Sequence, residues 1–87
     1  MQTVRYYIGI IHKDEGSDFG ISFPDFPGCI SAGSDLSELA VMGQEALRGH
    51  ITLMADEGLP IPEPSSMDVV MGHPDNRVGT PVLIPAP

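Results

Sequence analysis

A long amphipathic segment between Asp35 and Gly58 sets the scale of any structure that this chain can form. Asp35 and Glu38 have the spacing of a capping box, which begins a helix, and Gly58 followed by Pro60 ends it. The residues of one helix face recur between these signals at intervals of three and four: Leu36, Leu39, Ala40, Gly43, Leu47, His50, Ile51 and Met54. Roughly 23 residues at about 1.5 Å each give a helix about 34 Å long, and its apolar face needs a sheet to cover it.

Three short β-prone runs precede this helix. Residues 4–11 are rich in β-branched and aromatic side chains at both parities, which predicts a strand that is partly buried on both faces. A turn cluster at 12–18 separates it from 19–23, where apolar residues alternate, so we expect an antiparallel hairpin. Residues 29–32 are predicted to form a third strand.

The chain after the helix is rich in proline. Pro60, Pro62 and Pro64 alternate in residues 59–65, which favours extended polyproline geometry along the surface. Residues 66–72 are ambiguous and are compatible with a helical turn capped by Ser65 or Ser66, whereas 73–80 are predicted to be a loop.

A fourth strand is predicted at residues 82–84. Pro81 and Pro85 flank it, and proline confines a strand to the edge or the end of a sheet. The order β-β-β-α-β predicts an α+β fold, with an antiparallel-rich sheet and one long helix on one face. At 87 residues we expect one domain covering 1–87.

The charge of the chain restricts the partners that it can bind. Twelve acidic and four basic residues give a net charge of −8, which repels nucleic-acid phosphate and anionic lipid. We therefore expect no direct binding to nucleic acid or membrane. The charge either only maintains solubility or attracts a basic protein partner. Because the core of so small a domain is marginal, we also expect a homo-oligomer, a dimer or higher.

The usage of cysteine bears on the compartment. Cys29 is the only cysteine, so no intramolecular disulfide can form and a reducing compartment is favoured. The N-terminus has no basic stretch followed by an apolar run, and no apolar run approaches the length of a membrane span. We expect a soluble, cytoplasmic protein.

The residues that could carry chemistry do not form a recognisable pattern. The three histidines, His12, His50 and His73, have no second ligand at metal spacing, so neither a metal nor a cofactor is predicted. His50 lies on or beside the apolar helix face, where a packed histidine is the simpler interpretation. Cys29 shows no pairing with a base and is interpreted as a small buried hydrophobe.

Acidic residues are the other candidates for catalysis. Two-metal phosphodiester chemistry needs carboxylates that converge. The carboxylates considered for such a site are Asp14, Asp18, Asp25 and Glu45. Two of them lie in a turn and one lies on the solvent side of the helix, so no convergent set is predicted and we expect no enzyme.

The heptapeptide FPDFPGC at 23–29 fixes the backbone between the second and third strands. Pro24 and Pro27 restrict φ, and Gly28 permits a sharp redirection, so these three residues are predicted to be structural. Asp25 and Phe26 either belong to the same corner or are presented to a partner, with Phe26 held near the rim.

Three separated motifs occur in order along the chain: FPDFPGC at 23–29, GSD at 33–35 running into ELA at 38–40, and IPEPS at 61–65. With them, the chain from about residue 6 to residue 65 resembles the HicB antitoxin family. The resemblance implies a degraded ribonuclease-H-like fold without working catalytic carboxylates. It implies a type II toxin–antitoxin role, in which the protein neutralises HicA, a small basic RNA-cleaving toxin with an active-site histidine.

The resemblance also implies assembly and leaves alternatives open. Family members form dimers or higher oligomers, and many carry a DNA-binding segment after this domain. No such segment is predicted within 1–87. The alternative functions are a residual ribonuclease-H-like nuclease and an oligomerisation module of a transcriptional repressor.

The predicted partner-binding residues are those that the hairpin loop and the FPDFPGC turn would display: Asp14, Glu15, Asp18, Asp25 and Phe26. Rim charges of this kind chiefly speed the encounter with a basic partner. The helix acids Glu38, Glu45 and Asp56 form the comparison set, being equally charged but on a different element.

Overall fold

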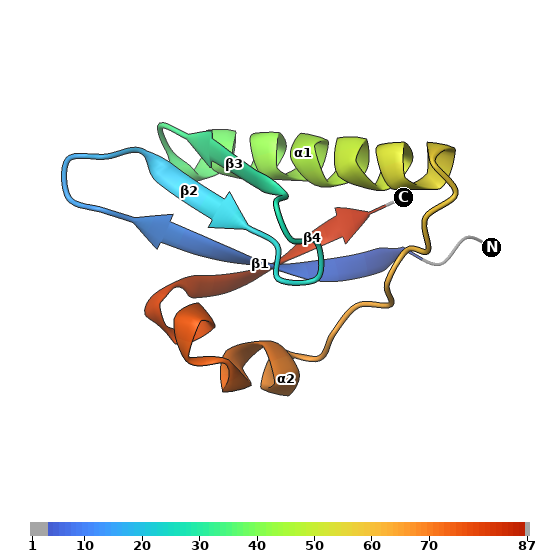
Figure 1. The fold of residues 1–87 in the computed structure, drawn as a ribbon. Coiled ribbons are helices and arrows are strands. Elements are labelled where there is room, and N and C mark those ends of the chain that lie inside the picture. The colour runs from blue at the N-terminus through green and yellow to red at the C-terminus, as the bar shows by residue number, and fades with distance from the viewer. Residues whose placement is uncertain (1–3, 87) are drawn as a thin grey trace.

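The computed structural model describes residues 4–86. Its strands form one antiparallel sheet in the order β3-β2-β1-β4. The strands are β1 (Arg5–Lys13), β2 (Phe19–Ser22), β3 (Ile30–Gly33) and β4 (Thr80–Ala86). Helix α1 (Leu36–Asp56) lies along one face of the sheet, and the short helix α2 (Met67–Gly72) lies at the other (Figure 1). The predicted α+β fold with one long helix is confirmed.

The predicted cap of α1 is present. The carboxylate of Asp35 accepts a hydrogen bond from the Glu38 N–H at 2.8 Å, and the Glu38 carboxylate accepts one from the Ser34 N–H at 3.1 Å. Glu38 thus reaches one residue further back than a standard capping box requires. The start of the helix is therefore held by both carboxylates.

Strand β1 is buried on both faces, as its composition predicts. Tyr7 belongs to the main core, which lies under α1 and includes Leu39 and Leu47. Ile8 and Ile10 point to the opposite face, where they pack with Val70 of α2 in a second, smaller cluster. The apolar side chains of β1 alternate between the two faces of the sheet, so each face needs its own helix to bury them.

Residues 59–65, here called the strap, connect α1 to α2 and are fastened to β1. The Tyr7 hydroxyl donates to the Pro62 carbonyl at 2.6 Å, and the Arg5 guanidinium lies 3.3 Å from the Glu63 carboxylate. Beyond the strap, the Ser66 hydroxyl accepts from the Val69 N–H at 3.3 Å and caps α2. The helical turn considered for 66–72 is present.

The loop predicted at 73–80 is wrong in part, because Pro74–Val78 form a 3₁₀ helix, η1. Pro74 supplies a preset φ at its start, and the His73 ring nitrogen Nδ1 accepts from the Asp75 N–H at 3.3 Å. At its end, Arg77 donates to the carbonyls of Met71 (2.8 Å) and Gly72 (3.2 Å) and ties η1 to α2.

The outer edge of β4 is closed by proline. Strand β4 pairs with β1 alone, with Ile10 opposite Pro81 and Tyr6 opposite Pro85. Because proline has no N–H to give to the β1 ladder, both nitrogens face outward, and between them only Leu83 can donate from this edge. The predicted edge position is confirmed, and the strand is longer than the predicted 82–84.

Candidate partner-binding site

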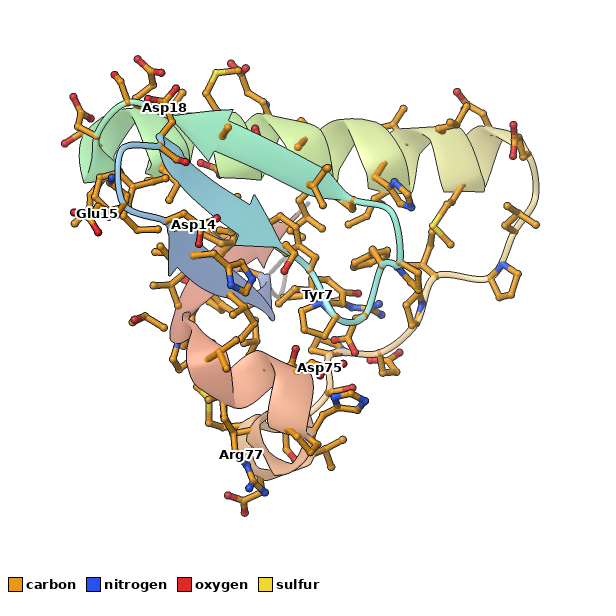
Figure 2. The ribbon with its side chains drawn as sticks, turned by 60° about the vertical axis from the view of Figure 1, so that its left-hand side comes forward. Tyr7, Asp14, Glu15, Asp18, Asp75 and Arg77 are labelled. Atoms are coloured by element: carbon orange, nitrogen blue, oxygen red, sulfur yellow. The ribbon has the colours of Figure 1, made fainter. Side chains whose placement is uncertain are left out.

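The tip of the β1–β2 hairpin carries three exposed carboxylates. Asp14, Glu15 and Asp18 are all exposed in the turn that Figure 2 shows projecting from the sheet. The turn is closed by the Ser17 N–H, which donates to the Asp14 carbonyl at 3.0 Å. Lys13 also donates to that carbonyl, at 3.2 Å, and its ammonium lies 5.5 Å from the Phe19 ring centroid. The structure therefore displays these three acids as predicted.

Sheet pairing brings further acids to the same end of the molecule. Phe19 of β2 is opposite Gly33 of β3, so Asp18 lies beside the short connection that leads into α1. Asp35 and Glu38 stand exposed in that connection and in the first helical turn. We call the five residues together the acidic end: Asp14, Glu15, Asp18, Asp35 and Glu38.

Sequence reasoning did not group Asp35 with the hairpin acids and placed Glu38 in the comparison set. Both were interpreted through their roles at the start of the helix, which the structure confirms. The signal that joins them to the hairpin is the register of β2 with β3. That register depends on pairing between segments about a dozen residues apart and cannot be read from periodicity.

An apolar groove lies beside the acidic end, between the start of α1 and β4. Its volume is about 280 Å³. It is lined by Ile11, Ile21, Leu36, Leu39, Ala40, Val82, Leu83 and Ile84. Leu36, which directly follows Asp35, is 57% exposed, although the periodicity assigned it to the buried face. The end of the molecule therefore combines carboxylates with a hollow that fits an apolar side chain.

The expectation that Phe26 lies near the rim is wrong. Phe26 is 1% exposed, and its ring packs edge-on against Tyr7 at 4.8 Å and His50 at 5.7 Å between centroids. The corner folds inward because the Phe26 N–H donates to the Phe23 carbonyl and the Cys29 N–H donates to the Phe26 carbonyl, both at 2.9 Å. Phe26 is a core residue of the chain.

Gly28 redirects the backbone at this corner, as predicted. Gly28 has φ +89°, a left-handed conformation that side chains with a Cβ rarely adopt. Pro24 is half-buried and Pro27 is exposed, and each lies directly beside one of the two residues proposed for a partner. The structural interpretation of these three residues fits the geometry.

Asp25 is engaged within the chain. Its carboxylate accepts from the Ser65 N–H at 2.9 Å and from the Ser65 hydroxyl at 2.5 Å, and the side chain is half-buried. The FPDFPGC corner and the IPEPS strap, 40 residues apart in sequence, are thus joined by one carboxylate. Of the two readings left open for Asp25, the geometry favours the corner.

The remaining candidates are structural. His50 is half-buried against Phe26, as the packed interpretation predicts. Cys29 is buried, and burial raises the pKa of its thiol, so the reactive thiolate is disfavoured.

Within residues 4–86, no three His, Cys, Asp or Glu side chains are grouped so that they could hold a metal ion. In the same range, no helix is both long and apolar enough to span a bilayer.

Comparison with known proteins places this fold. Residues 7–86 match the family described as HicB-like antitoxin of bacterial toxin–antitoxin systems. A curated relative, an uncharacterised 14.9 kDa protein in the rep–hol intergenic region of Haemophilus phage HP1, is 34% identical over 57 residues. That match takes in 66% of this chain and 43% of the phage protein.

Solved structures agree with the family match. The crystal structure of the Burkholderia pseudomallei antitoxin HicB superposes with a TM-score of 0.80 and 25% identity, over 91% of this chain and 61% of that one. A HicA3–HicB3 toxin–antitoxin complex aligns with a TM-score of 0.72 and 26% identity, over 94% and 95%. A toxin–antitoxin complex from Streptococcus pneumoniae, 17% identical with a TM-score of 0.76, shares the fold. The chain spans less than two thirds of the phage relative and of the Burkholderia antitoxin.

Proposed function

The chain belongs to the family of HicB-like antitoxins of bacterial toxin–antitoxin systems, and we propose that it binds and neutralises a basic RNA-cleaving toxin of the HicA type. The observation that carries this proposal is the family match over residues 7–86. A HicA3–HicB3 complex whose aligned chain matches this one over nearly its whole length supports the class of partner. In this proposal the protein acts in the cytoplasm and is not itself an enzyme.

The acidic end is the proposed toxin-binding surface. A toxin that cleaves RNA must present positive charge to phosphate, and a carboxylate-rich surface can occupy that region in place of RNA. The nearest cation, Lys13, is already turned toward the Asp14 carbonyl. Two other described cations are also engaged: Arg5 faces Glu63, and Arg77 binds carbonyls of α2. Arg48 is exposed on α1, ten residues beyond Glu38. The acidic end therefore keeps a strong net negative field.

Charge reversal at two ends of the molecule tests this surface. The test variant is Glu15→Lys with Asp18→Lys, and the matched control is Asp56→Lys with Glu57→Lys at the far end of α1 (Figure 1). Both pairs are exposed and both change the net charge by the same amount. We expect the test variant to slow association with a catalytically inactive HicA-type toxin by about tenfold at low salt, with little change in dissociation. The control should bind nearly as fast as the wild type.

The association rates of the test and control variants distinguish the ways in which the proposed surface could be wrong. If the control slows association as much as the test variant, the overall charge and not the acidic end steers the toxin. If the control alone loses binding, the toxin sits at the other end of α1. Binding to surface-immobilised toxin measures the association and dissociation rates, and stopped-flow mixing at two salt concentrations checks the association rate.

The nuclease alternative has its own assay. We expect the purified protein to leave RNA and RNA–DNA hybrids intact in Mg²⁺ or Mn²⁺. Metal-dependent cleavage that disappears in Asp25→Asn would show that a catalytic carboxylate survives in this fold.

A further inference from the structure

The groove between α1 and β4 is lined by hydrocarbon side chains. This holds for each of the described residues around it, and two of them, Leu36 on α1 and Leu83 on β4, are 57% and 58% exposed. Its volume of about 280 Å³ is at the lower limit of the pockets, about 300–1,000 Å³, that hold drug-sized ligands. Because these side chains offer no polar group to orient a small molecule, the groove suits an apolar side chain of a larger partner.

The hollow exists because α1 lies toward one side of the sheet. The helix packs more extensively against β3 than against β4, so Val82, which points toward the helix, stays only half-buried. Ala40 faces the groove from the helix, is itself exposed, and has only a methyl group with which to fill the space. Contiguous apolar side chains that a chain leaves open in this way mark an interaction site.

The outer edge of β4, beside the groove, offers more acceptors than donors. Pro81, Leu83 and Pro85 direct their carbonyl oxygens away from β1, and of these three only Leu83 has an N–H. An added strand would leave some of its own carbonyls without a donor here, which disfavours strand pairing. A segment that brings N–H donors on Lys or Arg side chains would satisfy the same oxygens. The edge therefore favours a donor-rich segment over an added strand.

Carboxylates stand at one end of the groove. Asp35 directly precedes Leu36, and Asp14 follows Ile11 by three residues, so the acidic end adjoins the apolar lining. Carboxylates, backbone acceptors and an apolar hollow are together complementary to a segment that carries an apolar side chain next to Lys or Arg. Nucleic-acid phosphate would be repelled from the same place. The chemistry around the groove thus selects a basic protein segment.

We propose that the groove receives one branched or aromatic side chain of the toxin, while Lys or Arg residues of the same toxin segment contact the acidic end and the β4 carbonyls. This contact rests on the proposed function, because its occupant is the toxin. Long-range charge speeds the encounter, whereas a buried apolar anchor governs how long the complex lasts. Among toxins of equal charge, the groove therefore selects those whose apolar side chain it fits.

Paired leucine substitutions on α1 test the groove. Leu36→Gln changes the lining, and Leu53→Gln, near the far end of α1, is the matched control, because both leucines are 57% exposed and neither change alters the charge. With a catalytically inactive HicA-type toxin, we expect Leu36→Gln to raise the dissociation rate by about tenfold and to keep the association rate within about twofold of the wild type. Leu53→Gln should match the wild type in both rates.

Filling the groove gives the converse test. Ala40→Leu adds a larger side chain inside it, while Ala55→Leu adds the same atoms at an exposed position in the last turn of α1. Alanine and leucine both favour the helix, so we expect the free energy of unfolding to stay near the wild-type value in both variants. Ala40→Leu alone should raise the dissociation rate, again by about tenfold, because its side chain then takes the place of the toxin's.

The wild type and the variants together separate the outcomes. If the wild type does not bind the inactive toxin, the proposed function fails and the groove contact fails with it. If the wild type binds, but Leu36→Gln and Ala40→Leu dissociate no faster than their controls, the function stands and the groove contact is wrong. Methyl NMR locates the occupant: the Leu36 and Leu83 signals should shift when toxin is added, and the Leu53 signals should not. Shifts on concentrating the protein alone would assign the groove to a second copy and overturn the proposal.

Discussion

The bond between Asp25 and Ser65 is the contact whose removal best tests how this fold is held together. Asp25→Ala removes both hydrogen bonds, the one from the Ser65 N–H and the one from its hydroxyl. Ser65→Ala removes the hydroxyl bond alone. Asp25→Asn removes the charge, but its amide oxygen can accept from the N–H and its amide nitrogen can donate to the hydroxyl. The three variants therefore separate geometry from charge.

The size of the effect follows from the chemistry of the bonds. A hydrogen bond to a charged group contributes about 1.5–3 kcal/mol, and the half-exposed position of Asp25 favours the lower end. We expect Asp25→Ala to lower the free energy of unfolding by about 2–3 kcal/mol, Ser65→Ala by about 1–1.5 kcal/mol, and Asp25→Asn by less than about 1 kcal/mol. In a domain of this size, 2 kcal/mol corresponds to a Tm lower by roughly 8–16 °C.

Urea unfolding followed by far-UV circular dichroism measures these free energies. The double variant Asp25→Ala with Ser65→Ala completes a double-mutant cycle, and we expect a coupling free energy of about 1 kcal/mol between the two side chains. The reasoning fails if Asp25→Ala unfolds at the wild-type urea concentration, or if the coupling is zero. A toxin association rate that falls in Asp25→Asn, at unchanged stability, would return Asp25 to the partner-binding set.

Two further substitutions and one thiol reagent probe the packing. Gly33→Ala should cost about 1–3 kcal/mol in urea unfolding, because the added Cβ would lie 2.6 Å from the Leu39 backbone nitrogen, and wild-type stability would show that α1 is not held against β3 as described. Phe26→Ala should cost about 3–5 kcal/mol, and a loss of toxin binding without a loss of Tm would restore its predicted partner role. Because Cys29 is buried and burial raises the pKa of its thiol, iodoacetamide should label it slowly at pH 8 in the folded protein and quickly in urea. The contribution of the neutral thiol to the free energy of unfolding is fully present below the ordinary cysteine pKa. It declines as the pH rises beyond that value, because the unfolded chain then loses the thiol proton first.

Local signals predicted the helices and strands, whereas long-range pairing determined which acidic residues lie together. The cap at Asp35, the hairpin acids and the proline-flanked edge strand follow from residue types within a few positions of one another. Phe26 was misplaced because a proline-bracketed corner has no periodicity to show which way a ring points. The position of Asp35 and Glu38 beside the hairpin acids depends on the register of β2 with β3, and the Asp25–Ser65 contact spans 40 residues. No local rule predicts either.

The pairing of β1 with β4 has a consequence for how the chain folds as it is synthesised. Arg5 pairs with Ala86, so β1 keeps one edge open until β4 has left the ribosome. Helix α2, which covers Ile8 and Ile10, is also made late. Closing so long a loop is slow, so the sheet is completed only after β4 has been synthesised. The acidic end, by contrast, is built from residues 14–38, and every part of it is synthesised before the strand that closes the sheet.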